Sequence, residues 1–162
     1  MSVSQRRHRG LVAATVTATL ALLLSGCGVS IPSDPDGTLE TVRGGELRVG
    51  VSPDPPLVED AEDRPSGSVV DLVDDFASSL DADTDWTVAT EETLVRMMEE
   101  GDLDLIAGGI TSDTPWLDRA GVTRGYTGID GADGHEIVML VPLGENAFLS
   151  ALERFLDEEA GT

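Results

Sequence analysis

The feature that most constrains the fold is a repeated change of hydrophobic period between residues 46 and 111. Short apolar runs at 46–52, 85–90 and 103–111 are typical of buried strands. The two segments between these runs place apolar residues on one face of a helix. Strands and helices that alternate in this way predict an α/β domain, with a mostly parallel sheet and helices on both faces.

The expected helices have recognisable ends. Ser68 opens the first helix, and with Asp71 three residues later it resembles a capping box. The second helix is expected over 91–102, with Gly101 at its end. After the third strand, Thr114 and Pro115 predict the N-cap and first residue of a short helix over 115–121.

The C-terminal part of the chain predicts two further strands and a helix. Strand candidates at 122–127 and 135–143 flank a spacer of sequence GIDGADG at 128–134. Gly and Asp give a hairpin loop the backbone freedom and polarity that it requires. With a last helix from Asn146, we expect a sheet of about five strands whose last two strands are joined as a hairpin.

The N-terminus has the pattern of an export signal. Three arginines in the first nine residues precede an apolar or small-residue run at 11–24, which is too short to span a bilayer comfortably. The run ends in LSGC and resembles the lipobox of bacterial lipoproteins, in which the Cys, here Cys27, is diacylated. A plain secretory peptide with an unmodified Cys is the alternative.

These features predict three regions. We expect a lipoprotein signal peptide over 1–26, a flexible tether over 27–45 and an α/β domain over 46–162. The mature protein would then be lipid-anchored at the extracytoplasmic face of the bacterial cell membrane.

The charge balance excludes some partners. Removal of the three leader arginines leaves 7 Arg and no Lys against 31 acids, a formal charge of −24. Nucleic acid and anionic lipid surfaces would be repelled, so neither is an expected partner. With a single Cys, the folded monomer has no disulfide.

No motif for catalysis or metal binding is convincing. Four acids match calcium-ligand positions of an EF-hand loop: Asp81, Asp83, Asp85 and Glu92. Trp86, however, stands where that loop needs Gly, and the same residues are required for a strand. Only one His, His135, follows the leader, and no Ser lies in a nucleophile elbow. We therefore expect no enzymatic activity, no metal and no cofactor.

The carboxyl edge of the sheet is the remaining candidate site, because open α/β folds bind ligands there. The segments 52–56, 67–68 and 109–114 should reach it. Their free N–H groups and hydroxyls suit a carboxylate or another small polar ligand. The alternative is that Ser68 and Thr114 are only helix caps.

Taken in order, four segments resemble the family 3 extracellular solute-binding proteins: ELRVGVSPDPPLVE, GSVVDLVDDFASSL, EGDLDLIAGGITSDTPWLDRAGVTRGY and HEIVMLVPLGENAFLSALERFL. Proteins of this family serve ABC importers, usually of amino acids or similar small polar solutes. The resemblance covers nearly all of 46–158. It implies the first lobe of a type 2 periplasmic-binding-protein fold, in which two α/β lobes close on a ligand.

The resemblance implies a set of ligand-binding residues: Asp54, Pro56, Ser68, Asp71, Thr111, Thr114, Trp116 and Arg119. The family commonly has an Arg that grips a ligand carboxylate three residues after the Thr of a Thr-Pro pair. Here the nearest Arg is two residues further on, about 200° round a helix. Arg119 is therefore either a substitute or the partner of a nearby acid, and Trp116 either stacks on a ligand or covers the core.

A second departure limits the expected function. The family has a whole second lobe where this chain has only the spacer 128–134. Because one lobe leaves an open surface, we expect weak or lost binding of a small polar solute, associated with ABC-type uptake. The alternative is an interaction lipoprotein that docks a transporter, a sensor or a second copy of itself.

Overall fold

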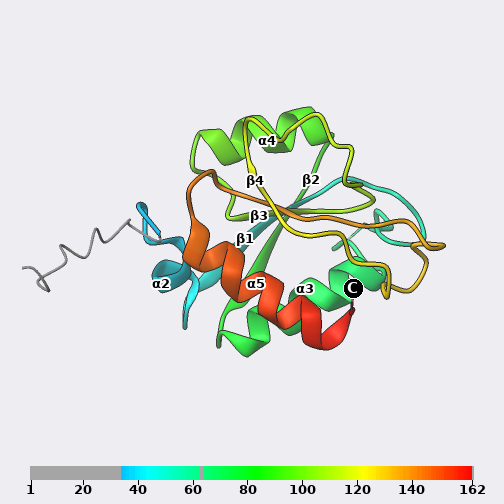
Figure 1. Cartoon of the computed structure of the whole chain (residues 1–162), viewed down its shortest axis with the longest axis horizontal. Helices are drawn as coiled ribbons and strands as arrows, with labels where there is room; N and C mark the ends of the chain where they lie inside the picture. The colour runs from blue at the N-terminus through cyan, green and yellow to red at the C-terminus, as the bar shows by residue number, and fades with distance from the viewer. Residues whose placement is uncertain (1–33, 63, 162) are drawn as a thin grey trace, which may run out of the picture. The chain divides into compact units, whose positions relative to one another are not determined.

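Five strands form a single sheet in the computed structural model, which describes residues 34–62 and 64–161 (Figure 1). The strands are β1 (Glu46–Val51), β2 (Asp83–Val88), β3 (Leu105–Ala107), β4 (Gly121–Val122) and β5 (Leu140–Val141). Their order across the sheet is β2-β1-β3-β5-β4. β1 pairs in parallel with β2 and β3, whereas β5 pairs antiparallel with β3 and β4.

The sheet is therefore mixed, and the prediction of a mostly parallel sheet is wrong. β5 follows β4 without a helical crossover, so it returns in the opposite direction. It lies between β3 and β4, and both of its pairings are antiparallel as a result. The antiparallel pair of β4 and β5 agrees with the expected hairpin.

Both of these last strands are shorter than predicted. Val122 pairs with Leu140, but Tyr126 pairs with Ile137, so the register shifts by one residue between the two pairings. A shift of this kind is a bulge, which interrupts the ladder of hydrogen bonds. The ladder continues only as single bridges beyond it.

Helices cover both faces of the sheet, as the sequence predicts. α4 (Glu91–Glu99) lies on one face, and α3 (Ser68–Ser79) and α5 (Asn146–Glu159) lie on the other (Figure 1). The short helix expected over 115–121 does not form. Arg119 and Ala120 donate their N–H groups to the Trp116 carbonyl, which closes one turn only. A single turn cannot offset the cost of nucleating a helix.

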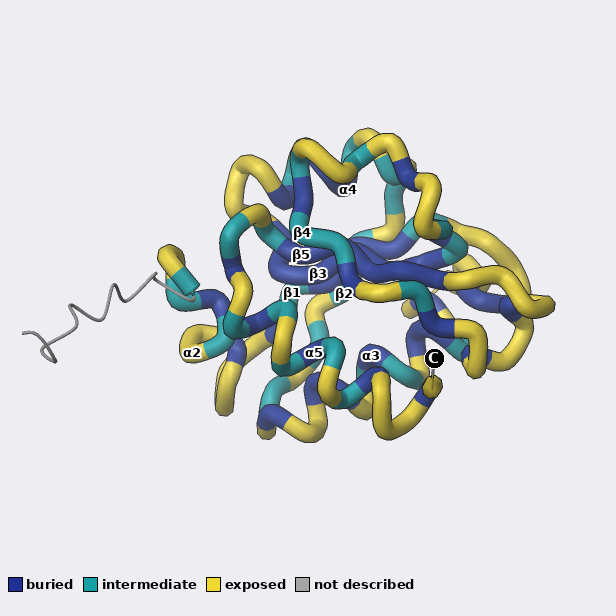
Figure 2. The backbone as a smooth tube through the Cα atoms, viewed as in Figure 1, coloured by how far each residue is buried: buried dark blue, intermediate teal, exposed yellow. Residues whose placement is uncertain are grey.

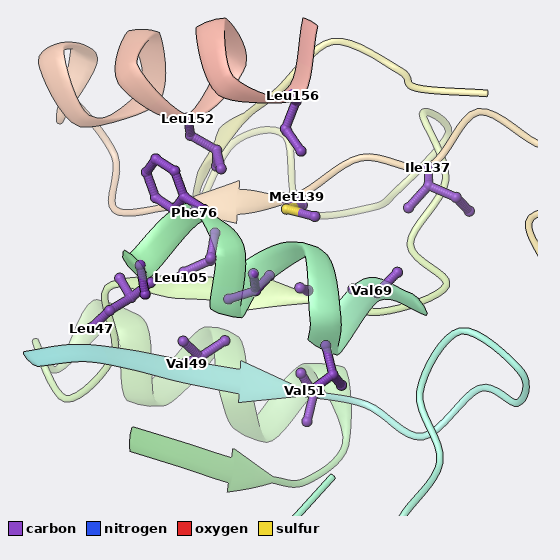
Figure 3. Close-up of a cluster of buried hydrophobic side chains, with 14 of the residues drawn as sticks. Leu47, Val49, Val51, Val69, Phe76, Leu105, Ile137, Met139, Leu152 and Leu156 are labelled. Atoms are coloured by element: carbon purple, nitrogen blue, oxygen red, sulfur yellow. The ribbon is translucent and has the colours of Figure 1, made fainter. Parts of the chain in front are cut away.

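Alternating residues of the strands supply the two halves of the core. Leu47, Val49 and Val51 of β1 pack toward α3 and α5, together with Phe76 and Leu152 (Figure 3). On the other face, a Cβ at Gly50 would lie 2.7 Å from Leu94 Cδ2, so the absence of a side chain lets α4 approach β1 closely. The central strands β1, β3 and β5 are thus largely buried, whereas β2 at the edge of the sheet is more exposed (Figure 2).

Residues 34–45 are folded, which corrects the predicted tether over 27–45. Helix α2 (Thr38–Val42) lies in this stretch, and Val42 is fully buried in the core. Asp34 Oδ2 accepts a hydrogen bond from Leu39 N–H at 2.8 Å, within the same stretch. Its Oδ1 accepts from Phe148 N–H at 3.1 Å, which ties the stretch to α5.

Glu145 completes this connection between the two ends of the domain. Its carboxylate accepts from the N–H groups of Asp36 and Thr38, both at 2.9 Å. Burial raises the pKa of Glu145, but these hydrogen bonds to the charged form outweigh it and lower the pKa overall. The connection could not be predicted from the sequence, because the groups that form it are more than 100 residues apart along the chain.

The unit that spans Pro32–Thr162 contains this core. The predicted signal peptide and Cys27 lie outside the described residues. Among the described helices, none is long and apolar enough to cross a bilayer.

Candidate functional site

The loops that follow β1 and β3 meet at the carboxyl edge of the sheet. The first loop, 52–58, is held by a backbone pair between Asp54 and Val58, with N to O distances of 2.9 and 3.0 Å. The second loop is 108–114. A Cβ at Gly109 would overlap Asp54 Oδ2, so only Gly at 109 lets the Asp54 carboxylate lie against the second loop.

The second loop also meets the chain segment before β5. Thr111 pairs with Ile137 as an isolated bridge, and Ser112 Oγ donates to Glu136 Oε2 at 3.5 Å. Thr111 Oγ1 donates to Asp113, and this hydrogen bond lowers the pKa of the Asp113 carboxyl. The edge therefore presents exposed carboxylates and hydroxyls side by side.

Ser68 lies at the same edge, but it does not cap α3. Gly67 occupies the N-cap position, and no side chain caps the helix, so the expected capping box with Asp71 does not form. Ser68 Oγ donates instead to the Asp130 carbonyl in the spacer, at 2.6 Å. Asp71 is exposed on the first turn of α3.

The spacer 128–134 is more than the hairpin turn that the sequence predicts. Ile129 and Ala132 are buried in the core. A Cβ at Gly131 would lie 2.6 Å from Pro56 Cγ, so the spacer also packs against the first loop. It therefore contacts the part of the edge formed by Pro56 and Ser68.

Thr114 and Trp116 are directed to the interior rather than to the open edge. Thr114 is only 6% exposed, and its hydroxyl has no hydrogen-bond partner among the described residues. It is therefore not a side-chain cap. Trp116 packs against the α4 side of the core, and its Nε1 donates to Glu91 Oε2 at 3.0 Å. This geometry favours a role for Trp116 in covering the core over a role in stacking on a ligand.

Arg119 lies at the opposite, amino edge of the sheet. Its Nε donates to Glu99 Oε1 at 2.8 Å, its second nitrogen also pairs with Glu99, and the guanidinium stacks over Trp116 at 5.3 Å. Hydrogen bonding to Glu99 raises the pKa of Arg119, and the same bond lowers the pKa of Glu99. Arg119 is thus the partner of a nearby acid.

The surroundings of Arg119 confirm this location. It lines a cleft of about 440 Å³, which we call the amino-edge cleft, together with Arg48 near the start of β1 and Asp104 just before β3. A second cleft, of about 530 Å³, lies beside β2 and includes Arg64 and Trp86. Neither of these two clefts is at the carboxyl edge.

The edge also contains residues outside the expected ligand-binding set: Gly109 and Asp113, which lie in the segment predicted to reach it, and Asp130 and Glu136, which do not. Gly109 had a visible signal, since it stands in a Gly pair directly after a strand. Glu136 had none, because its position depends on the pairing of Thr111 with Ile137. Within residues 34–62 and 64–161, no group of three or more His, Cys, Asp or Glu is placed to hold a metal ion.

A model of the bacterial extracellular solute-binding proteins, family 3, matches residues 47–158 of the 162. The chain belongs to this family. The family is one of solute-binding proteins rather than enzymes, in agreement with the expectation from the sequence. No curated protein sequence matches the chain significantly.

Solved structures of arginine-binding proteins have the same fold. The arginine-bound form of domain 1 from TmArgBP is 24% identical, with a TM-score of 0.63 over 74% of this chain and 97% of that one. A mutant of ArgBP from T. maritima is 14% identical, with a TM-score of 0.62 over 75% and 93%. An ancestral arginine-binding protein bound to arginine is 12% identical, with a TM-score of 0.59 over 70% and 92%. The solute-binding domain described here is thus a single lobe of the periplasmic-binding-protein type.

Proposed function

We propose that the protein is a lipid-anchored, extracytoplasmic solute-binding lobe that takes a small amino-acid-type solute on its carboxyl edge and takes part in ABC-type uptake. The observation that carries the proposal is the meeting of loops 52–58 and 108–114, with Asp54 against Gly109. These are the loops that open α/β folds use to bind ligands. Exposed hydroxyls and carboxylates there offer hydrogen bonds to a polar solute.

A single lobe is a reasonable solute binder on structural grounds. The domain that matches this chain over 97% of its own length was solved alone in an arginine-bound form. An open edge nevertheless leaves much of a solute in water, whereas tight sites bury most of it. We therefore expect dissociation constants of about 1 mM, or roughly −4 kcal/mol.

The alternative, a protein that docks a partner through the same edge, would be favoured by an apolar patch there. Among the described residues the exposed large hydrophobics are Val88, Leu117 and Leu143. None of them belongs to loops 52–58 or 108–114, and Leu57 and Ile110 within those loops are buried. The charge and polarity of the edge therefore favour a small polar solute.

Calorimetry on a soluble form that begins at Pro32 tests solute binding, since that form retains the core and the Asp34 contacts. We expect saturable heat with arginine or another amino acid at pH 7. Asp54→Ala should weaken binding, whereas Asp118→Ala, at the amino-edge cleft, should not. Absence of both heat and thermal shift at about 10 mM of each amino acid would contradict the proposal.

The lipid anchor has a separate test at Cys27. Each buried CH2 of an acyl chain contributes about 0.8 kcal/mol, so two chains hold a protein firmly on a membrane. We expect Cys27→Ser to move the protein from the membrane fraction to the soluble fraction, while Ser30→Ala leaves it membrane-bound. Membrane retention of Cys27→Ser would refute anchoring through this residue.

A further inference from the structure

The carboxyl edge contains several exposed acids and no Arg or Lys. Three loops form it: 52–58, 108–114 and 128–137, the last being the spacer and the residues that follow it. These loops contain five acids: Asp54, Asp113, Asp130, Asp133 and Glu136. All five are exposed, and the only basic side chain in the three loops is that of His135.

Three contacts join these loops into one surface. Asp54 lies against Gly109, Ser112 donates to Glu136, and the spacer at Gly131 packs against Pro56. The five acids therefore belong to loops that meet at one edge of the sheet. The fold and the family define where this edge lies, and the charges on it bear on which solute it accepts.

The arginines of the described residues lie outside these three loops, and five of them are paired with acids. Arg119 is paired with Glu99 at the amino-edge cleft, where Arg48 pairs with Asp104. Arg64 pairs with Asp74, Arg96 with Glu100, and Arg124 with Glu153 and Asp157. The other two, Arg43 and Arg154, follow α2 and lie within α5.

Charge complementarity follows from this arrangement. A solute carboxylate at the edge would meet acids and no fixed cation, and like charges oppose binding. An ammonium or guanidinium group would instead find carboxylates with free oxygens, such as Asp54. Hydrogen bonds between a guanidinium and a carboxylate are also charge-assisted and therefore strong.

We infer that this edge selects a solute by its cationic group and does not require the solute to carry a carboxylate. The inference rests on the proposed function, because it concerns the same edge. It assigns Asp54 and Glu136 as the residues that determine specificity, and it excludes Arg119 as a partner of the solute. The expected solute class is that of small amines and guanidines.

Four probes separate the charges: arginine, agmatine (arginine without its carboxylate), citrulline (arginine with a neutral side chain) and glutamate. Calorimetry at low salt should show agmatine binding at least as tightly as arginine. Citrulline should bind about five-fold more weakly than arginine, and glutamate should not bind. Added salt should weaken the binding of agmatine, because exposed charges are screened.

Variants test the residues. Asp54→Asn and Glu136→Gln should each weaken agmatine binding about two- to five-fold, with unchanged thermal unfolding. Asp118→Asn removes an equal charge beside the amino-edge cleft and should leave binding unchanged. Arg119→Gln should not change the affinity for arginine.

The outcomes separate the two proposals. Arginine binding at least five-fold tighter than agmatine, or a loss of arginine affinity in Arg119→Gln, would overturn this inference and leave the solute-binding proposal standing. Binding of glutamate would likewise overturn this inference and leave the solute-binding proposal standing. Absence of binding for all four probes would overturn the proposed function, and this inference with it.

Discussion

At the scale of single residues, Tyr126 has the most defined environment. It is the only Tyr in the chain and is 1% exposed. Its hydroxyl lies 3.1 Å from the Glu153 carbonyl oxygen and 3.2 Å from Asp157 Oδ1, both acceptors on α5. Burial raises the pKa of Tyr126 to about 12 from the ordinary 10.0, although the charge of Arg124 opposes this.

This environment predicts the alkaline behaviour of the protein. In the unfolded chain Tyr126 loses its proton near pH 10, but in the folded protein it keeps it to about pH 12. The neutral hydroxyl thus stabilises the fold below pH 10, and that contribution is lost as the pH rises to about 12. Ultraviolet titration should give a tyrosinate midpoint near 12, and Tyr126→Phe should abolish the signal. A midpoint near 10 would mean that the hydroxyl is open to solvent.

The candidate site was only partly predictable at this scale. Asp54 and Thr111 are at the carboxyl edge as expected, because each stands in a loop that follows a parallel strand. Arg119 does not lie at the carboxyl edge. No helix forms at 115–121, and the chain turns back toward β4, so that Arg119 lies beside Glu99. This ion pair joins side chains 20 residues apart in the sequence, so no local sequence pattern predicts it.

At the scale of elements, the spacer 128–134 is a packed part of the lobe that connects β4 to β5. Its residues Ile129 and Ala132 are buried in the core, and it contacts Pro56 and Ser68. Two glycines in it, Gly131 and Gly134, have φ of 83° and 80°. A Cβ at Gly131 would meet Pro56, whereas a Cβ at Gly134 would meet nothing within 4 Å.

These two glycines form a matched pair for mutation. Gly131→Ala and Gly134→Ala should share a backbone cost of about 1 kcal/mol, because Ala disfavours positive φ. Gly131→Ala should lose about 1–3 kcal/mol more, because its methyl group overpacks against Pro56. Urea unfolding measures the difference. Equal losses in the two variants would contradict the packing of the spacer on the first loop.

Helices and strands were predictable where the signal is local. The apolar period places α3 from Ser68 and α5 from Asn146, as observed, because a periodic stripe needs no distant partner. The place of β5 between β3 and β4 was not predictable, since it depends on which strands the returning chain can pair with. The register shift before Tyr126 likewise has no apolar signature.

At the scale of the whole molecule, the described domain is a single lobe with an open edge. It differs in this from the two-lobe arrangement, in which a solute is enclosed between the lobes. Within the lobe, the spacer is hydrogen-bonded to Ser68, and the carboxylates of Asp34 and Glu145 tie residues 34–38 to the start of α5. The core of the single lobe is therefore closed without a second lobe. The carboxyl edge remains exposed at Asp54, Ser112 and Asp113. An open edge of this kind agrees with the weak, rapidly reversible solute binding that we propose.

The most direct test of this account is a map of where a solute binds. Amide proton–nitrogen spectra of the soluble form from Pro32 should be recorded during titration with arginine. We predict saturable shifts confined to residues 52–58, 108–114 and 128–137. Shifts gathered around Arg48 and Arg119 at the amino-edge cleft, or no shifts at all, would contradict a solute-binding site at the carboxyl edge.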